Sequence, residues 1–327
     1  MRVLLTGAGG FLGRNVAPAL AERGYQVRGL FRAEPQRHLH GACSEFSVAD
    51  IRDRAQVVAA LDGCDACVHA AAAVSLLPSY SSAARQVTVG GTDTLLRATD
   101  VVGRQRIIHI GSASSFCFGT KSRPGTEESA YRGRRYRLGY ANYKHAAQQV
   151  AAQHTANGSP VVLVTPTFML GPLDTHLGGS RLVLQVARAP RVGCRSVIPC
   201  PPGGRNFVAV SDVADGICRA LELGEPGRAY LLGHRNLRYT ELMATIGEVI
   251  GLATYTFALP RNLMRAVGSA TGVASRRTPR ISVAVAGAAC DDHYYSAARA
   301  VRELGLPQTP LKRAIEASWR WLQDSYG

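Results

Sequence analysis

Short apolar runs alternate with amphipathic stretches through the first half of the chain. The runs predict strands, and the stretches between them, in which apolar residues recur every three or four positions, predict helices. The predicted strands are residues 2–6, 27–31, 45–48, 66–70, 106–112 and 161–165, and the main predicted helices are residues 11–23, 83–102 and 140–157. Strands and helices that alternate in this way form a parallel sheet covered on both faces. We therefore expect an α/β fold with a doubly wound parallel sheet.

The pattern changes after Pro166. Glycine and proline cluster at residues 171–179 and 199–204, while apolar runs at 207–210 and 230–232 predict two strands that return to the sheet. This organisation predicts a main domain and a smaller, mostly helical lobe over the carboxyl edge of the sheet. We assign residues 1–170 and 205–235 to the main domain and residues 171–204 and 236–327 to the lobe.

Two helix starts can be identified in the second half. Ser211 is placed to cap a helix over residues 212–223, and Thr309 with Pro310 forms a good cap and first-turn pair for the last helix. The apolar residues of the last helix follow helical spacing, and we expect them in the core: Leu311, Ile315, Trp319 and Leu322.

Three glycines follow the first predicted strand at Gly7, Gly10 and Gly13, with Phe11 and Leu12 between the last two. Glycines in a strand–turn–helix let backbone N–H groups approach a pyrophosphate, and the helix N-terminus adds a partial positive charge. The spacing departs from the commoner G-x-G-x-x-G, and a purely structural turn would contain similar residues. The order of strand, glycines, helix and strand favours a phosphate-binding loop for a dinucleotide.

The end of the second strand indicates which dinucleotide. An acidic residue there holds the ribose 2′-hydroxyl of NAD, whereas an arginine suits the 2′-phosphate of NADP. The segment ends Leu30-Phe31-Arg32 and contains no carboxylate. We therefore predict NADP (NADPH) as the cofactor, with Arg32 on the 2′-phosphate and Arg14 as a weaker helper. The alternative is that Arg32 is an ordinary surface arginine.

Tyr140 and Lys144 are four residues apart on a predicted helix and therefore share one face. A neighbouring ammonium favours the phenolate form of tyrosine, and lowering the phenol pKa by about 3 units requires about 4 kcal/mol. A tyrosine tuned in this way can transfer a proton to or from a carbonyl oxygen. The alternative is that Tyr136, Tyr140 and Tyr143 are packing residues and that Lys144 is solvated.

The predicted strand 106–112 leads into hydroxyl side chains at Ser112, Ser114 and Ser115, at the edge of the sheet where ligands bind. The T-G-x-x-G-x-x-G loop, this serine-rich strand end and the Y-x-x-x-K motif together resemble the extended short-chain dehydrogenase/reductase family over nearly the full length. The resemblance implies a Rossmann fold, a substrate-binding role for the smaller lobe, and catalysis by Ser114, Tyr140 and Lys144. Ser115 is the second candidate for the serine.

The resemblance also implies cofactor contacts along the chain. Asp50 and Ile51 resemble a pair that contacts the adenine, Ala70, Ala71 and Ala72 a run that flanks the cofactor, and the segment from Pro166 one that lies beside the nicotinamide. The full set of expected cofactor contacts is Gly7, Gly10, Phe11, Leu12, Gly13, Arg32, Asp50, Ile51, Ala70, Ala71, Ala72, Tyr140, Lys144, Pro166, Thr167 and Met169.

Two departures from the family pattern narrow the resemblance. Thr88 stands where the family has asparagine, which puts a proton-relay or structural role there in doubt, and Thr165 stands where sugar-nucleotide enzymes have arginine. With Arg32, these differences favour a reductase-like branch similar to dihydroflavonol reductases and 3β-hydroxysteroid dehydrogenases. The implied activity is NADP-dependent reduction of a ketone or oxidation of the alcohol.

In the implied mechanism Tyr140 donates the proton, Ser114 binds the oxygen, and Lys144 lowers the tyrosine pKa and contacts the ribose. Two alternatives remain open: a nucleotide-sugar epimerase or dehydratase, and a non-catalytic NADP-binding regulator. The apolar lobe residues suit a hydrophobic substrate or a core, and His176 and Met169 are candidates for the pocket by position. The lobe residues are Leu173, Leu177, Leu182, Val183 and Val186.

The net charge is +15, and nearly all the cations are arginines spread along the 327 residues, apart from a cluster at 132–137. We expect a solvated basic surface, with no nucleic-acid or membrane partner, a small carbonyl or alcohol substrate, and a homodimer by family analogy. No stretch approaches about eighteen uncharged apolar residues, and no signal peptide precedes the first strand, which indicates a cytoplasmic protein.

Two residue clusters could be taken for other kinds of site. Cys64 and Cys67 form a C-x-x-C among eight scattered cysteines, and we expect them to be buried and free. Asp291, Asp292 and His293 could suggest a metal site, but three adjacent residues of a regular element cannot converge on one ion. We expect a solvated turn there and no metal.

Overall fold

The computed structural model describes residues 1–35, 43–74, 81–103, 105–131, 139–175, 178–264, 266 and 283–326. The arginine cluster at 132–137, Tyr136, His176 and Leu177 lie outside these residues. Among the described helices, none combines the length and the apolar character needed to cross a lipid bilayer.

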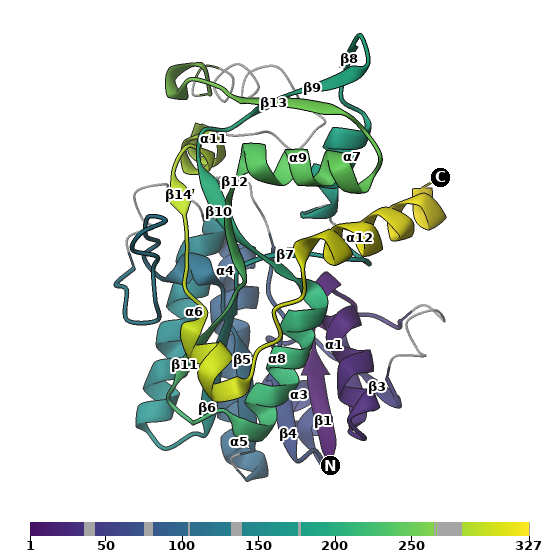
Figure 1. Cartoon of the computed structure of the whole chain (residues 1–327). Coiled ribbons are helices and arrows are strands. Elements are labelled where there is room, and N and C mark those ends of the chain that lie inside the picture. Colours follow the sequence, from purple (N-terminus) through teal and green to yellow (C-terminus); the bar gives the residue numbers. More distant parts are fainter. Residues whose placement is uncertain are drawn as a thin grey trace.

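A seven-stranded parallel sheet forms the centre of the molecule (Figure 1). Its order is β11-β6-β5-β4-β1-β2-β3. The order in which strands are added to the sheet therefore reverses between β1 and β4, which is where open α/β sheets bind ligands. The strands are β1 (Arg2–Thr6), β2 (Gln26–Phe31), β3 (Glu45–Val48), β4 (Ala66–His69), β5 (Arg106–Ile110), β6 (Val161–Pro166) and β11 (Ala229–Leu232). This topology confirms the predicted doubly wound α/β fold.

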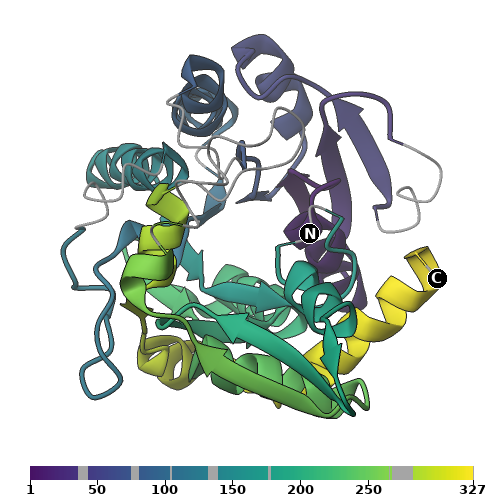
Figure 2. The same cartoon turned by 90° about the horizontal axis from the view of Figure 1, so that it is seen from above.

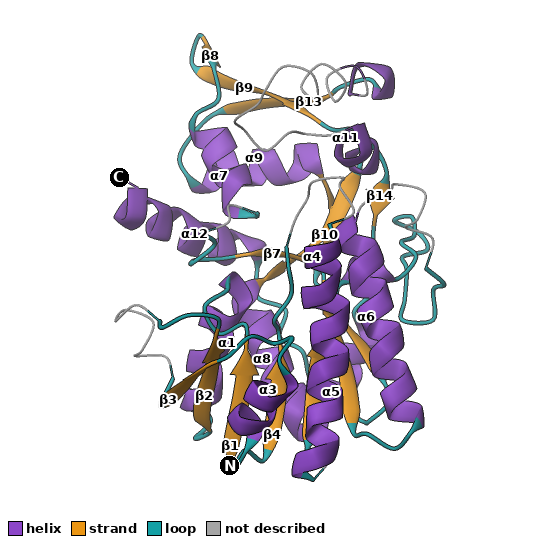
Figure 3. Ribbon diagram, turned by 180° about the vertical axis from the view of Figure 1, so that it is seen from behind, coloured by secondary structure: helices purple, strands orange, loops and turns teal. Residues whose placement is uncertain are grey.

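Helices cover both faces of this sheet because apolar residues occupy both sides of its strands (Figure 3). Val3 and Leu5 of β1 pack in one core cluster with α1 (Phe11–Glu22) and α8 (Val210–Leu223). On the opposite face, Leu4 packs with α3 (Arg54–Leu61) and α5 (Gly91–Val102), and α6 (Gly139–Ala156) packs beside α5. The predicted helices 11–23 and 140–157 are each found to within one residue.

The predicted helix 83–102 is divided into three parts. It consists of α4 (Ser82–Arg85), a π-helical turn, η1 (Gln86–Gly90), and then α5. A π turn inserts one residue into the helical ladder, which periodicity does not reveal. The turn contains Thr88.

The strand predicted at 207–210 does not return to the large sheet, and that expectation is wrong. β10 (Gly204–Ala209) lies in a separate four-stranded sheet with β7 (Phe168–Leu170), β12 (Arg235–Arg238) and β14 (Asp292–His293). Gly204 allows this, because a Cβ there would lie 2.6 Å from the Leu237 carbonyl oxygen of the paired strand. Only β11, predicted at 230–232, rejoins the seven-stranded sheet. The overall division into domains stays a prediction.

The rest of the lobe lies beyond the carboxyl edge of the large sheet (Figure 1). A three-stranded sheet of β8 (Arg191–Val192), β9 (Arg195–Cys200) and β13 (Thr254–Ala258) packs on α9 (Tyr239–Val249), which in turn packs on α7 (Ser180–Ala187). The remaining elements are η2 (Ala113–Ser115), α11 (Val283–Ala289), η4 (Ala300–Leu304) and α12 (Leu311–Tyr326).

Neither predicted helix start is found as expected. α8 begins at Val210 with Ala209 as its N-cap and no side-chain cap, so Ser211 lies inside the first turn. α12 begins at Leu311, and the Thr309 hydroxyl instead donates to the Asp212 carboxylate at 2.6 Å. Asp212 therefore connects the start of α12 to α8. The core prediction for α12 is confirmed: Leu311, Ile315 and Leu322 are buried and Trp319 packs against them.

The predictions for the Cys64 and Cys67 pair and for residues 291–293 have different outcomes. Cys64 and Cys67 are buried and free, as predicted. The solvated turn expected around residues 291–293 is wrong, because Asp292 and His293 form β14, which pairs with β10. The His293 ring lies 4.0 Å from the ring of Phe118, centroid to centroid, and is buried.

Candidate active site

The turn after β1 can exist only with glycine at two of its positions. Gly7 has a φ of +69°, and a Cβ there would lie 2.8 Å from the Ala71 nitrogen. A Cβ on Gly13 would collide with the Gly7 carbonyl oxygen. The same carbonyl accepts the Gly10 N–H at 3.0 Å, which closes the turn. The loop therefore has the tight geometry that a phosphate-binding turn requires.

Helix α1 starts directly from this turn at Phe11 and Leu12. Gly10 is its N-cap, no side chain caps it, and its first turn contains no acidic residue. First-turn N–H groups without a cap carry a partial positive charge that attracts anions. The residues present therefore fit a diphosphate, which the glycines admit and the helix start would bind.

The run after β4 lies beside the glycine turn, as expected. Ala70 N–H donates to the Thr6 carbonyl at 3.2 Å, and Ala71 N–H donates to the Thr6 hydroxyl at 3.1 Å. These bonds hold the Ala70, Ala71 and Ala72 backbone against Gly7, so the structure brings the two predicted cofactor segments together.

His69 joins these segments through hydrogen bonds that define its tautomer. The Thr92 hydroxyl donates to the Thr88 carbonyl at 2.7 Å, so it accepts from His69 Nε2–H at 3.1 Å. His69 Nδ1 then accepts from the Thr6 hydroxyl at 2.8 Å. Burial first, and the Lys144 charge second, lower the pKa of His69 to about 3. The ring is therefore neutral and links β1, β4 and α5.

Thr88 has a structural role in the same junction. Its side chain is buried, and its hydroxyl accepts the Ala73 N–H at 3.1 Å. Thr88 therefore has a structural role, which the absence of the family's asparagine had put in doubt. Thr165, the second departure, is fully buried in β6 and donates to the Tyr230 carbonyl at 3.2 Å.

At the part of the cofactor site where the adenine is expected, an exposed arginine lies near a carboxylate that is paired with another arginine. Arg32 is exposed at the end of β2, near enough to Asp50 to contribute to its low pKa. Hydrogen bonds from Arg52 are the main cause that lowers the Asp50 pKa to about 2. Ile51 instead packs in the core against Gly91, so its side chain faces away from this surface.

A cavity of about 740 Å³ opens beside this surface. It lies between the start of α3 and the π turn, next to Asp50. Its lining residues are Asp50, Arg52, Asp53, Gln56, Gln86, Gly90 and Thr94.

The phenol of Tyr140 meets a strand-end hydroxyl at the carboxyl edge of the sheet. The hydroxyl is that of Ser112, which hydrogen-bonds the phenol. Ser112 Oγ also lies 2.8 Å from Ser114 Oγ and accepts the Ser114 N–H at 3.3 Å. The three side chains form one chain of hydroxyl groups, and all are partly exposed. Ser115 is buried inside η2.

Sequence reasoning named Ser112 only as part of the strand end and missed its contact with the phenol. In the family motif, the spacing between the catalytic serine and the last glycine of the motif selects Ser114. This spacing does not show where the phenol oxygen of Tyr140 lies. Ser112 is the N-cap of the 3-10 turn, and its side chain accepts the Ser114 N–H there. A cap before three small residues is the signal that could have indicated it.

Lys144 lies one helical turn from Tyr140 with its side chain buried. Its Nζ donates to the Ile110 carbonyl at 2.8 Å, and burial lowers its pKa to about 8. Burial also raises the pKa of Tyr140, and only the Ser112 hydrogen bond opposes that rise. The expectation that Lys144 lowers the pKa of Tyr140 stays a prediction. The phenol keeps its proton at neutral pH.

The segment expected beside the nicotinamide leads from β6 into the lobe. Pro166 ends β6, and the Thr167 hydroxyl donates to Asn206 Oδ1 at 2.8 Å. Met169 lies in β7, which pairs with β10. Val183 and Val186 of α7 are fully buried in the lobe core, so they are core residues.

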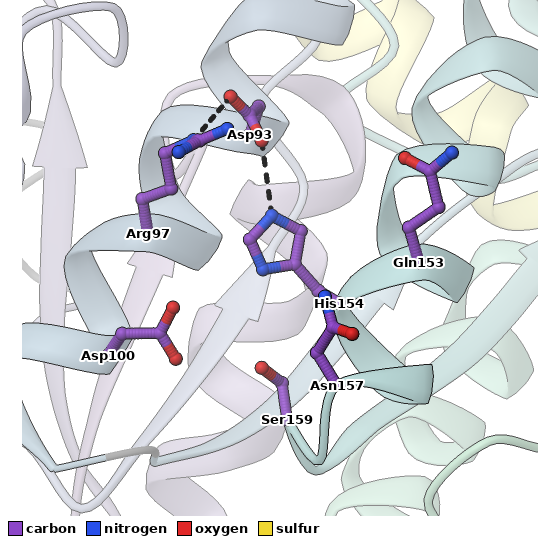
Figure 4. A pocket seen from close by; sticks show the side chains of 7 residues that line it. All are labelled: Asp93, Arg97, Asp100, Gln153, His154, Asn157 and Ser159. Carbon is purple, nitrogen blue, oxygen red and sulfur yellow. Dashed lines mark hydrogen bonds and ion pairs between the residues drawn. The ribbon is translucent and has the colours of Figure 1, made fainter.

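A polar pocket of about 290 Å³ lies between α5 and α6, at the opposite end of α6 from Tyr140 (Figure 4). Asp93 accepts from Arg97 at 2.8 Å and interacts with His154 at 3.1 Å. Burial raises the pKa of Asp93, but these two hydrogen bonds outweigh it and lower the pKa. The contact of Asp93 with His154 joins α5 to α6.

The family of the chain follows from these features and a direct match. The model of the NAD dependent epimerase/dehydratase family matches residues 3–233, which span the seven-stranded sheet. The chain belongs to the NAD-dependent epimerase/dehydratase family. This confirms the resemblance to extended short-chain dehydrogenases/reductases that the motifs indicated. The protein is accordingly an NAD(P)-dependent enzyme of that type.

Relatives of this epimerase/dehydratase-family protein include two named bacterial proteins. It is 27% identical over 343 residues to sterol demethylase protein B of Methylococcus capsulatus, with 99% of both chains covered. It is 31% identical over 238 residues to the 4-hydroxy-2-methyl-3-oxo-4-farnesyl-3,4-dihydroquinoline-1-oxide ketoreductase of Stigmatella aurantiaca, which covers 71% of this chain and 68% of that protein. Among solved structures, gox2253 has a TM-score of 0.84 at 26% identity, covering 99% of this chain and 98% of that one.

Proposed function

We propose that the protein is an NADP-dependent ketone reductase, able to oxidise the corresponding alcohol, that acts on a hydrophobic substrate. The observation that carries the proposal is the hydrogen-bonded group of Ser112, Ser114 and the Tyr140 phenol at the carboxyl edge of the sheet, with Lys144 behind it. A proton donor and a second hydroxyl at one point are what reduction of a carbonyl requires from the protein.

The direction of proton transfer follows from the pKa of the phenol. Because burial raises the pKa of Tyr140, the phenol is protonated at neutral pH and acts as the acid. Tyr140 donates its proton to the substrate oxygen as the carbonyl carbon gains a hydride, and an alcohol results. Ser114 donates a hydrogen bond to the same oxygen, and Ser112 orients the phenol.

The nicotinamide dinucleotide, when bound, supplies the hydride. The glycine turn and the start of α1 would hold its diphosphate, and Ala70, Ala71 and Ala72 would flank it. Lys144 would contact the ribose on the nicotinamide side, where its ammonium fixes a hydroxyl group.

The preference for NADP rests on charge at the end of β2. Arg32 is exposed there, and the nearby Asp50 carboxylate is engaged by Arg52. A 2′-phosphate would meet a guanidinium for which the described residues provide no ion pair, whereas a ribose hydroxyl would find no carboxylate in the strand-end sequence Leu30-Phe31-Arg32.

Two observations support a hydrophobic substrate. The Stigmatella relative is named as a ketoreductase of a farnesyl quinoline oxide, and the Methylococcus relative as a sterol demethylase protein. The buried Thr165 also leaves no cation at a position where sugar-nucleotide enzymes have arginine. An apolar ketone therefore suits this chain better than a sugar nucleotide.

The test is to incubate the protein with NADPH and a panel of terpenoid, steroid and aryl ketones, and to follow NADPH absorbance. The proposal expects cofactor oxidation with at least one apolar ketone and none with nucleotide sugars. Interconversion of a UDP- or dTDP-sugar by protein that retains bound NAD would instead support the epimerase alternative. Tight NADPH binding without turnover on any class would support a regulator.

A further inference from the structure

The three-stranded lobe sheet has an outer face that is apolar although it faces solvent. In the register of β8, β9 and β13, Val192 pairs with Arg195, Tyr255 with Val197, and Phe257 with Pro199. Paired residues of neighbouring strands point to the same side of a sheet. These six side chains therefore form one face, which we call the outer face, and Arg195 is its only polar member.

The opposite face of the same strands is the one that packs inside the lobe. Ser196, Ile198 and Cys200 of β9 are buried, and Thr254 of β13 meets Gly247 of α9. A sheet with one solvated face normally carries polar residues on that face. Here the solvated face carries Val192, 71% exposed, Tyr255, 54%, and Phe257, 36%. Exposed apolar groups gathered in this way indicate an interaction surface.

The outer face lies at one extreme of the molecule. Figure 1 shows β8, β9 and β13 at the end farthest from the N-terminus, and Figure 2 shows β9 and β13 side by side. Val192 lies next to the glycine turn of the β8–β9 hairpin, where Gly193 has a φ of +59°. The Tyr255 and Phe257 rings lie 5.9 Å apart, centroid to centroid. The tip of the hairpin and these rings are exposed among the residues that the structure describes.

Arginines accompany this face. Residues 175–211, which include β8 and β9, contain five arginines and no aspartate, glutamate or lysine. Arg188, Arg191 and Arg195 are exposed, and within the described part of the chain no carboxylate pairs with them. One third of the net charge of +15 therefore comes from residues 175–211.

We propose that the outer face binds the surface of an anionic lipid bilayer. Aliphatic and aromatic side chains that enter the headgroup region, with arginines that face lipid phosphates beside them, are the composition of an interfacial anchor. Val192 and Pro199 have no aromatic ring to stack on a base, which favours lipid over a nucleic acid. The expectation from overall composition, that the protein has no membrane partner, is replaced by this proposal.

The first test is sedimentation of the full-length protein with vesicles of equal parts phosphatidylcholine and phosphatidylglycerol, and with vesicles of phosphatidylcholine alone. We expect binding to the anionic vesicles only, weakened by salt. Tyr255→Ser/Phe257→Ser and Arg191→Ser/Arg195→Ser should each weaken it about tenfold or more. The matched controls remove similar groups elsewhere: Leu223→Ser, at a residue 58% exposed, and Arg302→Ser/Arg313→Ser should bind as the wild type does.

A second readout locates the contact. Cys194 adjoins the hairpin tip and is the one cysteine of the eight that is exposed, so it can carry the fluorophore NBD after Cys43 and Cys117 are replaced by alanine. Insertion of the tip predicts a blue-shifted NBD emission with anionic vesicles. No binding, or binding that the face variants leave unchanged while their thermal unfolding matches the wild type, would overturn the proposal. A dimer without lipid, or a nucleic-acid complex, that the same face variants abolish would also overturn it.

Discussion

The ammonium of Lys144 donates to the main-chain carbonyl of Ile110 at 2.8 Å, one turn along α6 from the phenol of Tyr140. This bond holds a buried charge at the end of β5, directly behind the serines. The structure therefore places the lysine as a neighbour of the strand backbone, whereas the Y-x-x-x-K spacing alone suggests a direct effect on the tyrosine.

The buried ammonium makes stability depend on pH above neutrality. Burial lowers the Lys144 pKa from 10.5 to about 8, so between these values the unfolded chain binds more protons than the folded protein. Stability contributed by this group must therefore rise with pH across that window, by roughly 3 kcal/mol at most. Denaturant titrations should show the free energy of unfolding of the wild type gaining on that of Lys144→Met between pH 8 and 10.5. A constant difference would show that the ammonium is not desolvated.

The two serines should have separable effects on turnover. Ser114→Ala removes a hydrogen bond to the substrate oxygen and should lower kcat by about 10²- to 10³-fold with an unchanged pH profile. Ser112→Ala removes the one contact that opposes the raised pKa of Tyr140, so its pH profile should shift to higher pH. The measurement is kcat against pH for both variants. Identical profiles would mean that Ser112 does not act on the phenol.

Arg32 should decide between the two dinucleotides. Arg32→Ser removes a charge-assisted contact to the 2′-phosphate and should weaken NADPH binding about tenfold or more, while NADH binding stays the same. Fluorescence titration of both cofactors measures this, and Arg14→Ser, with a smaller loss, is the matched control. Tighter binding of NADH than of NADPH by the wild type would refute the assignment.

His69 and His109 provide a matched pair for stability. They are partners on β4 and β5, with ring centroids 5.4 Å apart, and both are buried. Both ring nitrogens of His109 lack a partner among the described residues, whereas those of His69 bond to Thr6 and Thr92.

The same substitution at these two positions should have opposite effects. His109→Leu removes unsatisfied polar atoms and should stabilise the fold by about 1–3 kcal/mol, whereas His69→Leu leaves the buried Thr6 O–H without its acceptor and removes the N–H that donates to Thr92, and should destabilise the fold by a similar amount. Thermal and denaturant unfolding give both values. Destabilisation by both would indicate that His109 has a partner, such as an ordered water.

The sequence predicted the large sheet well because its strands are short apolar runs bounded by turn residues, and all but the edge strand β3 are largely buried. Strands 2–6 and 45–48 match β1 and β3 residue for residue. The lobe was harder to predict, because its strands are short and join partners distant in the chain, as β10 does with β7, β12 and β14. Apolar periodicity indicates that 207–210 is a strand but carries no information about which sheet it joins.

The candidate site was predictable as far as its motifs and no further. The glycine turn and the run after β4 lie together as expected, and Tyr140 and Lys144 lie one turn apart on α6. The contact of Ser112 with the phenol, the bond of Lys144 to Ile110 and the pKa of Tyr140, which burial raises, were not predictable, since they depend on side-chain directions within a 3-10 turn and on burial. Spacing along one helix gives a shared face, and only the structure gives the partner.

The most direct measurement of the central claim is single-turnover reduction by Tyr140→Phe. The substitution removes only the phenol oxygen, so NADPH affinity should stay within about twofold of the wild type while hydride transfer to a ketone that the wild type reduces falls by about 10³-fold or more. Circular dichroism of the variant establishes that it is folded. Turnover by Tyr140→Phe at the wild-type rate, with NADPH bound, would contradict the account.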